Sequence, residues 1–147
     1  MIYLDYAATT PLDPRAREAM LPWLDDYTGF GNPASDHALG RRARAAVEAA
    51  RAEVAALLGA TPDEIIWTSG ATESNNLAIK GALEFRGQQQ GHIVTSRIEH
   101  KSVLDTCRYL ETRGTRVSYL TPGSDGLIGV EQVLAALQPD TALVSLM

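Results

Sequence analysis

A polar turn between an apolar run and a helix is the segment of this sequence best suited to hold an anion. The run Ile65–Thr68 is typical of a buried strand, the turn Ser69-Gly-Ala-Thr72 follows it, and a helical pattern covers Glu73–Arg86. The first amides of a helix lack partners within the helix, and the helix dipole is positive there. The turn therefore offers N–H donors and two hydroxyl groups, which predicts a phosphate site. Simple helix capping by Ser69 or Thr72 is the alternative.

The turn does not follow the two common nucleotide-binding patterns. It contains neither the Gly-x-x-x-x-Gly-Lys-Ser/Thr loop nor the Gly-x-Gly-x-x-Gly loop. The predicted ligand is therefore a phosphate group on a molecule that these patterns do not identify.

His100 is the second candidate for chemistry, because it closely follows another apolar run, His92–Ser96. If both runs are parallel strands, their carboxyl ends meet at one edge of the sheet, and His100 lies on the same rim as the phosphate turn. An imidazole can stack on a flat heteroaromatic ring and exchange protons near neutral pH. A purely structural histidine at the end of a strand is the alternative.

The other histidines and the cysteine do not suggest a metal site. His37, His92, His100 and Cys107 have none of the close spacings of metal ligands, so we expect no metal. His37 belongs to a loop before a long helix, which we expect Ser35 or Asp36 to cap.

Cys107 lies on an apolar stripe of its predicted helix together with Val103 and Leu110. A nucleophilic cysteine needs an exposed, electropositive environment, which the apolar face of a helix does not offer. We therefore expect Cys107 to be a small core residue.

The candidate residues need a parallel sheet to bring them together. Further apolar runs at Arg116–Leu120 and Ala142–Met147 alternate with helical patterns over Lys101–Arg113 and Val130–Leu137. Strands that alternate with helices of this length are typical of β/α units with crossover connections. The sequence predicts an α/β fold in which N-terminal helices precede β/α repeats of a mainly parallel sheet.

The first 60 residues follow a different pattern. Met1–Pro11 is expected to be extended and to end in a turn, and a helix begins near Asp13, with Pro14 in its first turn and a break at Pro22. A loop over residues 28–33 precedes a long amphipathic helix that ends before Gly59. We therefore assign residues 1–60 to an N-terminal helical segment and residues 61–147 to the first part of an α/β domain. Because the last strand has no element after it, we expect the chain to be a truncated part of a longer protein.

Composition excludes several classes of protein. The net charge is −5 and the isoelectric point is about 5.1, so there is no basic field for nucleic acid. No apolar stretch approaches the roughly 20 residues of a membrane span. The start has neither the basic segment nor the apolar run of a secretory signal. We expect a cytoplasmic protein without nucleic-acid or membrane partners.

Four segments in order resemble the cysteine desulfurases, a family of class V aminotransferase-like, fold-type-I pyridoxal-phosphate enzymes. These segments are Tyr3-Leu-Asp-Tyr-Ala-Ala-Thr-Thr-Pro11, Gly31-Asn-Pro-Ala-Ser-Asp-His37 with Gly40-Arg41, Thr68–Asn76, and Glu99-His-Lys101. The resemblance implies that pyridoxal 5'-phosphate is the cofactor and that residues 61–147 begin its large domain. Ala71 and Thr72 would hold the phosphate, and His100 would stack on the ring and assist proton transfer. Asn32 and residues 5–9 would lie near the entrance or a subunit contact.

The resemblance also implies a reaction and partners. The family converts L-cysteine to L-alanine and passes the sulfur through an enzyme persulfide to iron–sulfur clusters or thio-cofactors, as a homodimer with an acceptor or scaffold protein. The Schiff-base lysine and the sulfur-accepting cysteine of the family have no counterpart in this chain. Lys80 and Lys101 are better explained as solvated helix residues, so the chain alone is expected to be inactive.

Two alternatives remain open. A phosphate turn does not select the substrate, so another class V enzyme, such as a selenocysteine lyase, a kynureninase-like hydrolase or an aminotransferase, also fits. A non-catalytic module with this fold is the other alternative.

Overall fold

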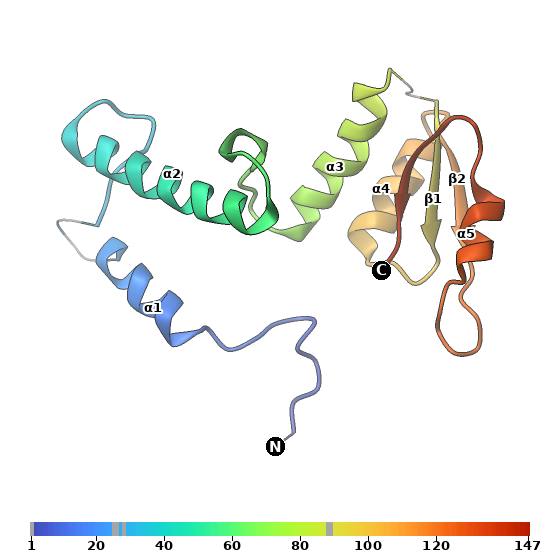
Figure 1. The fold of residues 1–147 in the computed structure, drawn as a ribbon, viewed down its shortest axis with the longest axis horizontal. Coiled ribbons are helices and arrows are strands. Elements are labelled where there is room, and N and C mark those ends of the chain that lie inside the picture. Colours follow the sequence, from blue (N-terminus) through green and yellow to red (C-terminus); the bar gives the residue numbers. More distant parts are fainter. Residues whose placement is uncertain (1, 25–26, 28, 88–89) are drawn as a thin grey trace. The chain divides into compact units, whose positions relative to one another are not determined.

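The computed structural model describes residues 2–24, 27, 29–87 and 90–147, and the chain divides into two compact units, Met1–Ile66 and Trp67–Met147. Figure 1 shows the helices of the first unit and the sheet with its helices in the second. Of the predicted N-terminal segment, residues 1, 25–26 and 28 lie outside this description. Neither helix nor strand is present in residues 29–33, as predicted for the loop.

The first unit begins with residues 2–5, which belong to no helix or strand, and a turn in which the Ala8 amide donates to the Asp5 carbonyl at 3.0 Å. Helix α1, Pro14–Met20, follows, and the Asp13 carboxylate accepts from the Arg15 amide at 2.8 Å. A 3-10 turn, η1 over Leu21–Trp23, ends this helix at the predicted proline. The predicted start and end of the first helix are therefore confirmed.

Helix α2, Ala38–Leu58, is the long helix of the first unit. The prediction that Ser35 or Asp36 caps it is wrong. His37 is the N-cap, and its Nδ1 accepts from the Gly40 amide at 3.2 Å, so an imidazole nitrogen takes the place of the expected hydroxyl or carboxylate. Gly59 ends the helix with φ of 67°, the left-handed conformation that glycine adopts without strain. A second 3-10 turn, η2 over Pro62–Glu64, follows.

The second unit contains the predicted β/α repeats. Its elements are α3 (Ala71–Phe85), β1 (His92–Ser96), α4 (Lys101–Glu111), β2 (Arg116–Leu120), α5 (Val130–Ala136) and β3 (Thr141–Ser145). The strands form a parallel sheet in the order β2-β1-β3, which confirms the predicted fold class.

One predicted strand is not part of the sheet. Ile65–Thr68 has no strand assignment, although the backbone of Ile65 is extended. A strand needs a neighbour to complete its ladder of hydrogen bonds, and no described strand runs beside this segment. The final strand is also shorter than predicted and begins one residue earlier, at Thr141.

The order of the strands explains where the helices lie. The connection through α4 runs from β1 to β2, whereas the connection through α5 runs back from β2 past β1 to β3. Right-handed crossovers in opposite directions put their helices on opposite faces, and Figure 1 shows α4 and α5 on either side of the sheet.

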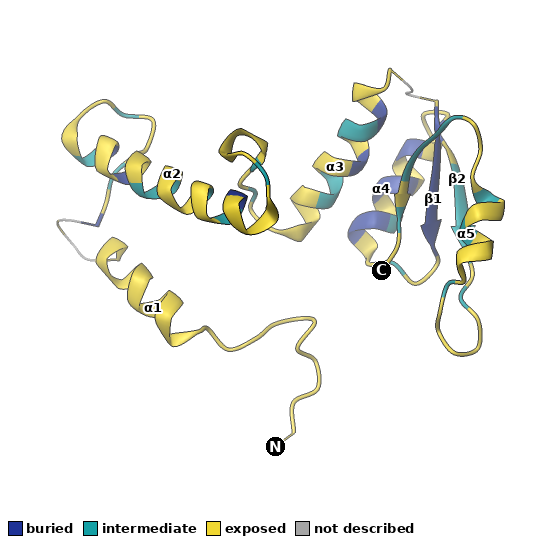
Figure 2. Cartoon of the chain, in the orientation of Figure 1, coloured by how far each residue is buried: buried dark blue, intermediate teal, exposed yellow. Residues whose placement is uncertain are grey.

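The core of the second unit lies between the sheet and the α3–α4 pair. Its buried residues are Ile79, Leu83, Ile93, Val103, Cys107 and Leu110. Figure 2 shows the burial concentrated on β1 and on the inner sides of α3 and α4, while α5 is largely exposed. The central strand is buried along its whole length, as a parallel strand between two neighbours should be.

A polar cluster fastens the amino-terminal edge of the sheet. The buried His92 ring is 2.8 Å from the Thr141 hydroxyl through Nδ1 and 2.9 Å from the Ser118 hydroxyl through Nε2, so it joins all three strands. The pairing of β1 with β3 shifts by one residue here, since His92 opposes Thr141 and Ile93 opposes Leu143. Ala142 is therefore an extra residue in β3, as in a β-bulge.

Candidate functional site

The phosphate turn leads into α3 through a glycine with an unusual backbone. Gly70 is the N-cap, with φ of 155° and ψ of −178°, and its carbonyl accepts from the Ser74 amide at 3.1 Å. The capping alternative is wrong, because neither Ser69 nor Thr72 caps the helix with its side chain. The helix begins at Ala71, so the amides of Ala71 and Thr72 are among those that have no partner inside it.

Glu73 fixes the turn from inside the first turn of α3. Its Oε2 accepts from the Ser69 amide at 2.7 Å and from the Ser69 hydroxyl at 2.6 Å. The hydrogen bonds from the Ser69 side chain and main chain lower the pKa of the Glu73 carboxyl. The carboxylate is thus ionised and bound to Ser69.

The space above the turn is open. A Cβ built on Gly70 would meet no atom within 4 Å, so this position is glycine because of its backbone conformation and not because of crowding. The Thr68 and Ser74 hydroxyls are 2.6 Å apart and tie the preceding segment to α3. Hydrogen bonds to α3 therefore hold the turn in place, and the space beside Gly70 stays open.

His100 lies where the sequence predicts it, four residues beyond the carboxyl end of β1. It is the N-cap of α4, and its Nδ1 accepts from the Ser102 amide at 3.1 Å. The ring itself is exposed. The capping bond therefore fixes one ring nitrogen and leaves the rest of the imidazole accessible.

The two predicted parts of the site meet at one hollow. Thr72 at the start of α3 and His100 at the start of α4 both line a depression of about 330 Å³. Ala71 is exposed next to Thr72 at the first position of the helix. The structure thus brings the phosphate turn and the histidine together, whereas Asn32 and residues 5–9 belong to the first unit.

This arrangement suits a ligand with an anionic end and a flat ring. Free helix-start amides and the Thr72 hydroxyl supply donors to an anion, and the positive end of the helix dipole favours negative charge there. An accessible imidazole offers a flat face and a titratable nitrogen beside them.

Sequence reasoning missed two residues that support His100. The Asn75 side-chain amide donates to the Ser102 hydroxyl at 2.8 Å, and that hydroxyl is 2.9 Å from Nδ1 of His100. Asn75 and Ser102 are 27 positions apart, so no local pattern could have paired them. The role of Glu73 was also missed, because its bonds to Ser69 span four positions and the common capping box spans three.

Cys107 is a core residue, as predicted. Its side chain is fully buried, and burial raises the pKa of the thiol to about 11. Within residues 2–24, 27, 29–87 and 90–147, no three histidine, cysteine or acidic side chains are grouped so that they could hold a metal ion. No described helix has both the length and the apolar composition needed to cross a bilayer.

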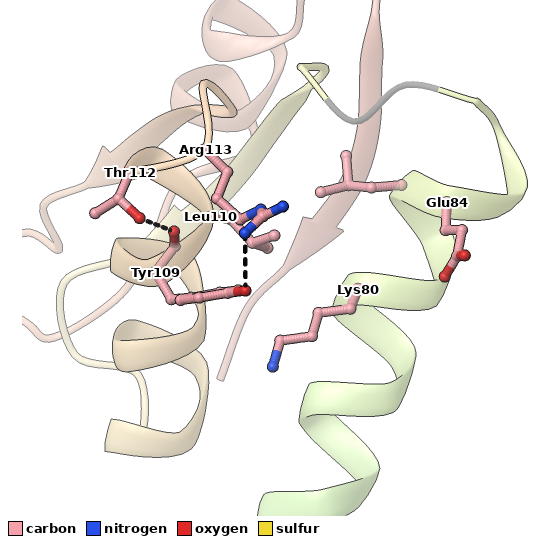
Figure 3. Close-up of a pocket in the computed structure, with 7 residues that line it drawn as sticks. Lys80, Glu84, Tyr109, Leu110, Thr112 and Arg113 are labelled. Carbon is pink, nitrogen blue, oxygen red and sulfur yellow. Dashed lines mark hydrogen bonds between the residues drawn. The ribbon is translucent and has the colours of Figure 1, made fainter.

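A second hollow, of about 420 Å³, lies between α3 and α4 (Figure 3). The Lys80 ammonium is 5.0 Å from the centre of the Tyr109 ring, and the Arg113 guanidinium is 5.8 Å from it. Lys80 was predicted to be a solvated helix residue. It is exposed, but its charge also contacts an aromatic ring.

Comparison with known proteins identifies the relatives of this chain. It is 58% identical over 147 residues to the cysteine desulfurase IscS of Tolumonas auensis and 58% identical over 147 residues to that of Azotobacter vinelandii. Each comparison covers 99% of this chain and 36% of the relative, so the chain spans about a third of the length of these proteins.

Solved structures give the same relationship. A structure described as SspA in complex with cysteine has a TM-score of 0.86 and 47% identity, covering 98% of this chain and 41% of that one. DndA from Streptomyces lividans has a TM-score of 0.80 and 49% identity, covering 99% and 40%. The sequence profile of the aminotransferase class V family matches residues 2–147. Proteins of this kind depend on pyridoxal phosphate, and this chain belongs to the aminotransferase class V family.

Proposed function

We propose that this chain is the cofactor-phosphate-binding part of a pyridoxal-phosphate-dependent cysteine desulfurase. The observation that best supports the proposal is the shared hollow of Thr72 and His100, in a chain with more than half of its residues identical to those of enzymes with this name. The similar SspA structure is a complex with cysteine, which supports cysteine as the substrate.

The described residues fit the two ends of the cofactor. A phosphate dianion needs several N–H and O–H donors, which the start of α3 and the Thr72 hydroxyl offer, and the nearby Glu73 carboxylate is already bound to Ser69. A pyridine ring needs a flat partner, which the exposed His100 imidazole offers. When bound, the cofactor supplies an electron sink for the substrate carbon.

In this proposal the chain's own residues bind, orient and move protons. The amides of Ala71 and Thr72 and the Thr72 hydroxyl hold the phosphate. His100 covers one face of the ring and carries a proton on Nε2, because its Nδ1 accepts from the Ser102 amide.

We propose that the Schiff-base lysine and the sulfur-accepting cysteine are provided from outside this chain. Lys80 contacts the Tyr109 ring, Lys101 follows the N-cap of α4, and Cys107 is buried. The 147-residue chain should therefore release no sulfide from cysteine. A homodimer in the cytoplasm that passes sulfur to an acceptor protein is also part of the proposal, on the strength of the family resemblance.

The test uses the protein that carries this chain, with Thr72→Val and His100→Ala compared with Thr112→Val. Thr112 lies at the end of α4, where its hydroxyl bonds to the Tyr109 carbonyl, so it is a matched threonine away from the Thr72–His100 hollow. We expect Thr72→Val to weaken cofactor binding about tenfold, which is the loss of about 1.4 kcal/mol. His100→Ala should lower sulfide release from L-cysteine by about 100-fold or more.

Equal cofactor affinity in all three variants would refute the assignment of Thr72. An unaltered protein that binds the cofactor but releases no sulfide or alanine from cysteine would instead favour another class V enzyme, such as a selenocysteine lyase, a kynureninase-like hydrolase or an aminotransferase.

A further inference from the structure

A continuous hydrogen-bonded path joins the helix of the phosphate turn to the ring of His100. The Asn75 side-chain amide donates to the Ser102 hydroxyl at 2.8 Å, and this hydroxyl is 2.9 Å from His100 Nδ1. Ser102 is buried, with 7% of its surface exposed, and Asn75 is half-buried. The path is therefore shielded from solvent over most of its length, where hydrogen bonds are worth more than on the surface.

The Ser102 main-chain amide determines which groups in this path donate and which accept. The Ser102 amide points at His100 Nδ1 from 3.1 Å, and an amide N–H can only donate. Nδ1 is therefore an acceptor, and the neutral ring carries its proton on Nε2. The Ser102 hydroxyl also donates towards Nδ1, which leaves its oxygen lone pairs for the Asn75 amide.

The path also joins the two halves of the proposed site. Asn75 follows Thr72 by three residues, so both side chains lie on neighbouring turns of the same side of α3. Ser102 is the second residue of α4, two positions beyond the N-cap His100. A shift of the ring relative to the phosphate turn would have to break one of these bonds.

We propose that Asn75 and the Ser102 hydroxyl are positioning residues that fix the ring of His100, as its Nε2–H tautomer, relative to Thr72. This rests on the proposed function in one respect, namely that the ring of His100 faces the cofactor. Nε2 has no hydrogen-bond partner among the described residues, so its proton is directed to the ligand or solvent. Simple packing between α3 and α4 would not place a hydroxyl group 2.9 Å from Nδ1.

The first test needs no cofactor. In the protein that carries this chain, labelled with 15N-histidine and freed of cofactor, the imidazole nitrogens of His100 report the tautomer by NMR, with assignment through His100→Gln. We expect Nδ1 to be unprotonated in the unaltered protein. Nδ1 should stay unprotonated in Ser102→Ala and Asn75→Ala, because the main-chain amide of residue 102 still donates to it, but its signal should shift because the hydroxyl donor is lost or misplaced. Ser102→Thr, which keeps the hydroxyl, should restore the original spectrum.

Glu84→Ala is the control for a general disturbance of α3, because Glu84 is exposed later in the same helix. It should leave the His100 signals unchanged. A spectrum that is the same in Ser102→Ala, Asn75→Ala and the unaltered protein would overturn the proposal, and so would a Ser102→Thr variant that behaves like Ser102→Ala.

The second test uses the cofactor-loaded protein and separates this inference from the proposed function. We expect Asn75→Ala and Ser102→Ala to lower kcat for cysteine about tenfold with KM changed less than about twofold, because a misaligned group affects the chemical step more than binding. Unchanged kcat in both variants would overturn the positioning role. If the unaltered protein does not act on cysteine although the His100 signals depend on the Ser102 hydroxyl, the proposed function fails and the positioning role stands.

Discussion

At the scale of single residues, the backbone conformation of position 70 requires glycine. Its φ of 155° is a region that residues with a Cβ rarely enter, although a Cβ would meet no atom there. Gly70→Ala should therefore destabilise the chain by about 1–2 kcal/mol through backbone strain alone. Urea unfolding followed by circular dichroism measures this change.

Gly81 provides the matched control in the same helix. It lies inside α3, has no left-handed backbone and would also give a new Cβ open space. Gly81→Ala should stabilise the chain by about 0.5–1 kcal/mol, because glycine is a poor helix former. Shifts of the same sign in both variants would contradict the strain assigned to Gly70.

The burial of Cys107 predicts that its thiol reacts slowly in the folded chain. With a pKa of about 11, only about one thiol in a thousand is ionised at pH 8, and the folded chain also blocks access to it. The 147-residue chain contains no other cysteine, so its rate of reaction with a disulfide reagent measures the reactivity of Cys107 alone. We expect slow labelling in buffer and rapid labelling in urea. Rapid labelling in buffer would mean that the α4 core opens easily.

At the scale of elements, the His92 cluster makes the sheet sensitive to acid. Burial lowers the pKa of His92 below its ordinary value of 6.5, and the charge of Arg116 adds to this, whereas Asp140 opposes it. The unfolded chain binds the proton more readily, so the stabilisation is complete above pH 6.5 and is lost as the pH falls below it. For one proton the slope is at most about 1.4 kcal/mol per pH unit.

We therefore expect the urea midpoint to fall between about pH 7.5 and about pH 5.5, and to fall less in His92→Gln. The nearby Arg116–Asp140 pair should not cause this change, because the hydrogen bond from Arg116 lowers the pKa of Asp140. A pH dependence that is identical in His92→Gln would assign the effect to other groups.

The contact of Lys80 with Tyr109 predicts a small coupling between α3 and α4. The two groups are exposed and 5.0 Å apart, so a double-mutant cycle with Lys80→Ala and Tyr109→Leu should give about 0.5 kcal/mol. Tyr109→Phe keeps the aromatic face and should keep the coupling. If Lys80→Ala costs the same free energy of unfolding with leucine at position 109 as with tyrosine, the ring is not the source of the coupling.

Local patterns predicted most elements, and long-range contacts explain the failures. β1 and β2 have the predicted ends, because each is a short apolar run next to clear helical patterns. Ile65–Thr68 is also a short apolar run, but no strand among the described residues pairs with it, and no local pattern reveals that. His100 was predicted from its place after a strand, whereas its partner Asn75 is brought close only by the packing of α3 on α4.

Across the whole molecule, one surface of the second unit should bind apolar dyes. A hollow of about 260 Å³ is lined by the end of α5 and by β3, and includes the exposed side chains of Leu137 and Val144. Scattered apolar side chains are normal on surfaces, but a lined hollow can hold a dye. The folded chain should raise the fluorescence of anilinonaphthalene sulfonate, and Leu137→Ser with Val144→Ser should reduce it. A signal that is unaffected by both changes would locate the dye elsewhere.

The extra residue in β3 gives the strand a tolerance that its neighbours lack. On either side of Ala142 the pairing is complete, with Thr141 opposite His92 and Leu143 opposite Ile93. Removing Ala142 would join Thr141 directly to Leu143, and both residues could keep their present partners in β1. Every later side chain of β3 would therefore keep its face of the sheet. A one-residue deletion within β1 or β2 would instead move every later side chain of that strand to the opposite face of the sheet. Loss of a codon in this sheet should therefore be tolerated at Ala142 and selected against in the other two strands.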